Sequence, residues 1–155
     1  MASDDPTVPD PAMYAPFRPR MTRAVGRGVV VVLALATLAL LYTSPGADGP
    51  WSDAGNTIAI LALAAVCLLL VLRHAGVYAI VDPQGIRVRN LVVTTVLPWS
   101  AIEAVRFGSG EPWVNLDLAD GGTLAVMAVQ GADGAFARAE AQRLATLVAA
   151  HTRPS

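Results

Sequence analysis

The sequence predicts an α+β protein: a transmembrane helical hairpin followed by a small antiparallel β-barrel or sandwich that a C-terminal helix closes. Two long uncharged runs predict the hairpin, twenty residues over 28–47 and nineteen over 54–72. Several short β-prone runs before one amphipathic helix predict the closed β structure. We therefore expect three parts: a disordered tail over 1–17, the hairpin over 18–74 and a folded domain over 75–155.

Each uncharged run is long enough to cross a membrane as a helix, at about 1.5 Å per residue against roughly 30 Å of hydrocarbon. We expect helices at about 24–43 and 55–72, antiparallel because the break between them is short. One alternative is the core of a soluble bundle, but core helices keep a polar face and these runs are apolar all round. The other is a cleaved signal peptide, although Pro45 fits poorly in a cleavage site ending at Ala47.

Basic residues set the expected orientation of the hairpin. Four arginines precede the first run and one follows the second, whereas the connecting loop holds two aspartates and no basic residue. Positive charge flanking the cytoplasmic ends predicts a multi-pass protein of the cell (inner) membrane with both termini in the cytoplasm. The five arginines are Arg18, Arg20, Arg23, Arg27 and Arg73.

The first seventeen residues are rich in Asp, Pro, Ala and Ser and have no apolar periodicity. Such a segment buries too little apolar surface to offset the entropy of ordering, which predicts a disordered tail. Phe17 at its end is expected to rest at the membrane interface.

After the hairpin the pattern changes to short strands. Val77–Val81 and Ile86–Arg89 flank Asp82-Pro83-Gln84-Gly85, which has the residue order of a type I turn. These two runs therefore predict a β-hairpin. Leu91–Leu97 is a longer run that must bend within itself, at the Thr94-Thr95 pair, before Pro98 marks its end.

A second hairpin is predicted further along the chain. After a strand over Ile102–Phe107, residues 113–118 alternate so that Val114 and Leu116 face inward. Asp120-Gly121-Gly122 supplies the turn, and Thr123–Met127 returns beside the first strand.

The chain ends in one amphipathic helix, over about 135–151, with Asp133 as its expected N-cap. Its apolar stripe is Phe136, Leu144, Leu147 and Val148, at three- and four-residue steps. Gln130 is expected in the loop before this helix.

Three stretches resemble a known family: Leu97-Pro98-Trp99-Ser100, Pro112–Gly121 and Thr123–Met127. They are similar to small actinobacterial membrane proteins with two transmembrane helices and a C-terminal bacterial pleckstrin-homology (PH)-like domain, some of them termed low-molecular-weight protein antigens. The resemblance covers about residues 20–150 and implies a PH-like fold, a cell-envelope location and no established enzymatic role.

The resemblance and the charge pattern together predict a non-catalytic, membrane-anchored PH-like module that binds or scaffolds a protein on the cytoplasmic face. The alternative is a membrane-surface sensor that binds anionic lipid headgroups through an arginine-bearing face. Candidate contact residues are Arg87, Arg89, Arg106 and Trp113. Arg87 and Arg89 share one strand face, which either meets the bilayer or is solvated and paired with Glu103 or Asp117.

Other partners and chemistries are not expected. A net charge of −1 gives no pull toward nucleic acid, and the single cysteine, Cys67, excludes an intrachain disulfide or a cysteine metal site. The polar residues form no recognisable catalytic set, so neither an enzyme nor a cofactor is predicted. The Asp82–Gly85 loop lacks the basic side chains that phosphoinositide-binding PH domains place there, so binding of soluble phosphoinositide headgroups is not expected.

Overall fold

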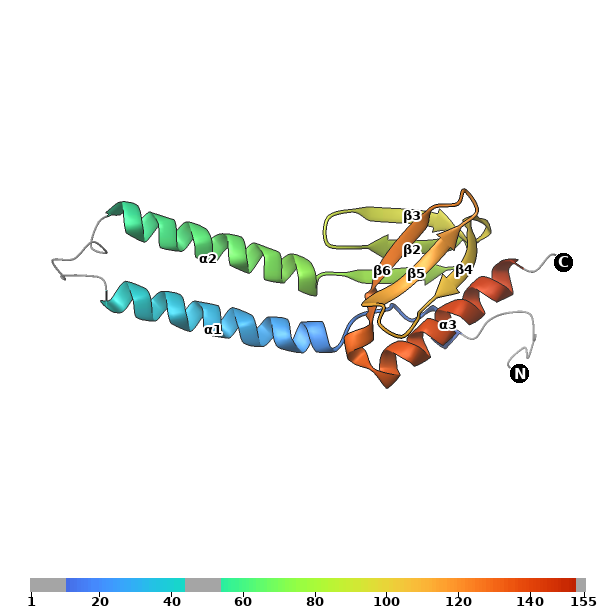
Figure 1. Ribbon diagram of the computed structural model, residues 1–155, viewed down its shortest axis with the longest axis horizontal. Coiled ribbons are helices and arrows are strands. Elements are labelled where there is room, and N and C mark those ends of the chain that lie inside the picture. The colour runs from blue at the N-terminus through green and yellow to red at the C-terminus, as the bar shows by residue number, and fades with distance from the viewer. Residues whose placement is uncertain (1–10, 44–53, 153–155) are drawn as a thin grey trace. The chain divides into compact units, whose positions relative to one another are not determined.

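The structure is a computed structural model and describes residues 11–43 and 54–152 (Figure 1). The chain divides into two compact units: residues 21–75, and a second unit that combines residues before and after them. We call the second unit the β domain; its described part is residues 11–20 and 76–152. The loop predicted between the two helices lies outside the described residues.

The first unit is a pair of helices, α1 (Met21–Thr43) and α2 (Ala54–Ala75), which run slightly beyond their predicted ends. Both are long and apolar enough to cross a membrane, and none of either apolar window is buried. A core helix of a soluble protein would be mostly buried, so this exposed apolar surface fits a lipid environment. The helices approach each other at Gly26, which faces Val71 and Ala75, because a residue without a side chain allows close packing.

The first antiparallel sheet follows α2 and has the order β1-β2-β3. Its strands are β1 (Tyr78–Asp82), β2 (Gly85–Arg89) and β3 (Thr94–Pro98). The hairpin predicted at Asp82–Gly85 is confirmed, since Oδ1 of Asp82 accepts the backbone N–H groups of Gln84 and Gly85 at 2.8 and 2.9 Å. A side chain at Gly85 would overlap the carbonyl of Leu97, so only glycine fits there.

The turn between β2 and β3 comes earlier than the sequence suggested. The backbone N–H of Asn90 donates to the carbonyl of Val93 at 3.0 Å, and β3 begins directly afterwards at Thr94. The run over 91–97 does turn within itself as predicted, but before Thr94 and not at the Thr94-Thr95 pair. Pro98 does end the strand, as predicted.

The second antiparallel sheet has the order β4-β5-β6. Its strands are β4 (Ile102–Arg106), β5 (Trp113–Leu118) and β6 (Thr123–Gln130). The hairpin of β5 and β6 is confirmed, with Val114 and Leu116 fully buried. However, β6 runs three residues further than predicted, because the register shifts between Trp113 and Val114. Gln130 thus ends β6 opposite Trp113 and is buried, which corrects its placement in a loop.

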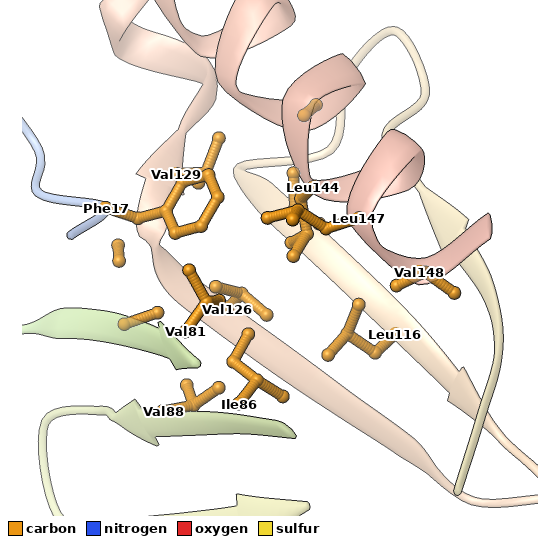
Figure 2. Packing of buried hydrophobic residues seen from close by; sticks show 14 of the residues in the cluster. Phe17, Val81, Ile86, Val88, Leu116, Val126, Val129, Leu144, Leu147 and Val148 are labelled. Atoms are coloured by element: carbon orange, nitrogen blue, oxygen red, sulfur yellow. The ribbon is translucent and has the colours of Figure 1, made fainter. Parts of the chain in front are cut away.

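The C-terminal helix α3 (Ala135–Thr152) closes the β domain. Figure 2 shows Leu144, Leu147 and Val148 pointing from α3 toward the side chains of the two sheets. Gly134, with φ of +58°, directly precedes the helix, and its carbonyl accepts the N–H of Arg138 at 3.2 Å. Gly134 therefore occupies the position just before the helix. Asp133, the predicted N-cap, lies one residue before Gly134, in the short 3₁₀ helix η3 (Gly131–Asp133), so that prediction is wrong.

Two side chains connect the sheets through backbone atoms. Asn90 donates from Nδ2 to the carbonyl of Ala125 at 2.7 Å and accepts the N–H of Met127 at 3.2 Å, so it occupies the outer edge of β6. Trp99, in the 3₁₀ helix η2 (Trp99–Ala101) that precedes β4, donates from Nε1 to the carbonyl of Asp82 at 2.9 Å. Both contacts satisfy backbone groups that would otherwise be left without partners.

The segment before α1 is part of the β domain, which corrects the predicted disordered tail for residues 11–17; residues 1–10 lie outside the described residues. A 3₁₀ helix, η1 (Pro11–Tyr14), leads to Phe17, which is fully buried and not at a membrane interface. The backbone of Phe17 exchanges two hydrogen bonds with Ala79 of β1, at 2.8 and 3.1 Å. The disorder prediction rested on the average composition of the segment. Burial of the single Phe17 side chain in the core is enough to order residues whose average composition is polar.

Arg143 of α3 holds this N-terminal segment in place. Its Nη1 donates to the carbonyls of Met13 and Ala15 at 2.7 and 2.8 Å, while Nη2 pairs with Glu140 at 2.7 Å. The guanidinium also lies 3.7 Å from the centre of the Phe17 ring. Several contacts converging on one residue fix the segment more firmly than a single pair would.

The pairing of Phe17 with Ala79 constrains how the chain crosses a membrane. Phe17 precedes α1 and Ala79 follows α2, yet both belong to the same compact β domain. If α1 and α2 span the bilayer, the start of α1 and the end of α2 must therefore lie on the same side of it. The same pairing argues against the signal-peptide alternative, because cleavage after α1 would remove Phe17 from the core.

Candidate functional site

The predicted arginine face lies on the first sheet. Arg87 and Arg89 are exposed on β2, while Ile86 and Val88, which alternate with them, are buried, so the two arginines share the outer face as predicted. Across the strands, Arg87 lies between Ile80 and Val96. Neither arginine makes an ion pair among the residues that the structure describes.

The remaining contacts of this face are with aromatic and apolar groups. Arg89 lies between Tyr78 and Thr94 in the register, and its guanidinium is 5.7 Å from the centre of the Tyr78 ring. Carboxylates are scarce here, since Asp82 is the only acidic residue in β1, β2 and β3. The outer face is thus cationic and apolar.

Arg106 belongs to a different surface. It lies on β4 and forms an ion pair with Asp117 of β5, with Nε and Oδ2 2.7 Å apart. This pair takes up one of the two carboxylates that could have paired with Arg87 or Arg89. The structure therefore does not bring the three arginines together.

Trp113 begins β5 and is half-buried, beside a hollow of about 410 Å³ that Pro112 helps to line. Glu111 and Arg138 also line this hollow. Oε2 of Glu111 accepts the N–H of Gly108 at 2.8 Å and so stabilises its own loop. Within the described parts of the chain, no three His, Cys, Asp or Glu residues come close enough to hold a metal ion.

One surface was missed by sequence reasoning. Outside α1 and α2, the exposed large hydrophobic residues of the described chain all lie on the first sheet or its β2–β3 turn: Ile80, Val92, Val93 and Val96. The sequence interpretation placed the bend of the 91–97 run at Thr94-Thr95, so it did not anticipate an exposed turn before β3. The signal available was Leu91-Val92-Val93, three apolar residues that follow Asn90 at the end of an alternating strand.

Two packed three-stranded antiparallel sheets, closed by a C-terminal helix and joined to two apolar helices, define a membrane-associated module of the PH type. Comparison with known families agrees: the bacterial PH domain family matches residues 78–146. The chain belongs to this family.

Relatives occur in mycobacteria. Uncharacterized proteins of Mycobacterium tuberculosis (strain H37Rv) and Mycobacterium bovis are each 31% identical over 118 residues, covering 76% of this chain and 77% of the relative. No solved structure matches the chain. The resemblance to actinobacterial membrane proteins with a PH-like domain is thereby confirmed.

Proposed function

We propose that this chain is a non-catalytic, membrane-anchored interaction module that holds a protein partner at the cytoplasmic face of the cell membrane. The observation that carries the proposal is the outer edge of β3 (Thr94–Pro98). Among the described residues, this edge has no strand beside it, whereas Phe17 pairs with β1 and Asn90 occupies the edge of β6. An open strand edge presents backbone donors and acceptors to an extended segment of another protein.

Trp113 offers a second contact for the same kind of partner. It is half-buried, and tryptophan is enriched among the residues that dominate protein interfaces. PH-type domains generally act by binding, and Glu111 at the nearby hollow holds its own loop in place.

Site-specific photo-crosslinking in cells tests the proposed partner. A photoreactive amino acid replaces Thr94 on the β3 edge or Trp113 on β5, and a matched control replaces Gln142, which is exposed on α3. We expect a discrete protein adduct from position 94 or 113 and none from position 142. Absence of a protein adduct from both positions 94 and 113 would contradict the proposal.

The cytoplasmic location is tested separately, by reporter fusion. The arginines that flank the two helices predict that a reporter active only outside the membrane is silent when fused after Ser155. The same reporter inserted beside Gly49 should be active. Activity after Ser155 with silence at Gly49 would reverse the proposed orientation and leave the crosslinking result unaffected.

A further inference from the structure

The exposed apolar residues of the β domain gather at one place. Val92 and Val93, in the β2–β3 turn, are 78% and 62% exposed, and Val96 on β3 is 61% exposed. Ile80 on β1 is in register with Arg87, which is in register with Val96. The outer face of the first sheet and its β2–β3 turn thus form one continuous apolar and cationic surface.

Chain connectivity keeps the start of β1 close to the end of α2. Tyr78 begins β1 only three residues after Ala75, the last residue of α2. At roughly 3.6 Å per extended residue, Tyr78 lies within about 11 Å of that helix end. Arg89 pairs with both Tyr78 and Thr94, so the β2–β3 turn lies at this same end of the sheet.

The chemistry of the surface matches a membrane interface. Arg87 and Arg89 provide two positive charges, and the single carboxylate of the sheet, Asp82, lies at the opposite end and binds backbone N–H groups of its own turn. Valines at a turn tip form a convex apolar projection that enters a headgroup layer more readily than it accepts a peptide side chain. Basic residues beside such a projection attract anionic lipid headgroups.

We propose that the outer face of β1–β3 rests on the same bilayer that α1 and α2 occupy, with Val92 and Val93 inserted at the headgroup level and Arg87 and Arg89 contacting anionic headgroups. This contact is additional to the protein partner proposed above: the bilayer contacts the exposed side chains of the sheet, whereas the partner pairs with the free backbone groups of β3. It orients the β domain on the membrane.

Depth measurements on the full chain in vesicles test the proposal. A nitroxide spin label is attached to Val92→Cys or Val93→Cys, each in a Cys67→Ala background, with Gln84→Cys as the control. Gln84 is exposed in the β1–β2 turn, at the opposite end of the same sheet. In vesicles of phosphatidylcholine mixed with phosphatidylglycerol, labels at 92 and 93 should collide more with oxygen, which enters the bilayer, than with a water-soluble nickel chelate. The label at 84 should show the reverse order.

The contribution of Arg87 and Arg89 to membrane contact is tested separately. The double variant Arg87→Gln/Arg89→Gln, high salt, or vesicles of phosphatidylcholine alone should each shift the label at 92 toward the nickel chelate. Unchanged depth under all three conditions would overturn the role of the arginines.

Two further results would overturn the proposal that the bilayer contacts the outer face of β1–β3. Labels at both 92 and 93 that are as accessible to the nickel chelate as the label at 84 would show that the turn stays in water. Spin–spin broadening that disappears when labelled chains are diluted with unlabelled ones would show that the surface pairs two copies of the chain instead.

Discussion

Replacing Phe17 with alanine is expected to lower the free energy of unfolding of the β domain by about 3–5 kcal/mol, the usual cost of removing a buried aromatic side chain. Phe17 is fully buried, and Arg143 stacks on its ring. The variant loses the ring and leaves a cavity against α3, although the segment that carries it is distant in sequence.

The measurement is chemical unfolding of the full chain in detergent, combined with hydrogen exchange of the backbone N–H of Ala79. This amide donates to the carbonyl of Phe17 at 3.1 Å, so faster exchange there reports release of the N-terminal segment directly. Arg18→Ala, an exposed neighbour, is the control and should unfold like the natural sequence. Equal stability of the Phe17→Ala and control variants would contradict the packing of this segment.

Leu144→Ala in α3 is the second substitution with a large expected effect, about 2–5 kcal/mol. Leu144 is fully buried in the core cluster that also contains Leu116 and Val126 (Figure 2). Since a domain of this size is typically stable by only about 5–15 kcal/mol, the loss is a large share of the total.

Gln142→Ala provides the matched control for Leu144→Ala. Gln142 is exposed on the same helix, two residues away, and its side chain can be removed without a cavity. Thermal melting of both variants should show a lower midpoint for Leu144→Ala alone. Coinciding midpoints would mean that α3 does not pack on the sheets through this face.

Local rules account for the parts of the fold that the sequence predicted. The hairpin turns at Asp82–Gly85 and Asp120–Gly122, the end of β3 at Pro98 and the shared face of Arg87 and Arg89 each follow from residues a few positions apart. Turn-forming residues and strand alternation act between residues a few positions apart, so a single sequence is enough to predict these features.

The features that the sequence did not predict depend on distant or register-dependent contacts. Phe17 meets Ala79 across more than fifty intervening residues, and no periodicity marks such a pairing. Gln130 is buried because a register shift in the β5–β6 pair extends the strand. The pairing of Arg106 with Asp117 likewise depends on the register of β4 against β5, which includes an irregularity.

The position of Phe17 also has a consequence for biosynthesis. The ribosome makes Phe17 before α1, α2 and the strand that contains Ala79. Phe17 can therefore pair with Ala79 only after both helices have been synthesised. A nascent chain in which only one helix crossed the bilayer would hold Phe17 and Ala79 on opposite sides. Its β domain would be left with an unfilled core, exposed to the proteases that remove misfolded proteins. If α1 and α2 span the bilayer, burial of Phe17 thus requires that both helices have crossed it.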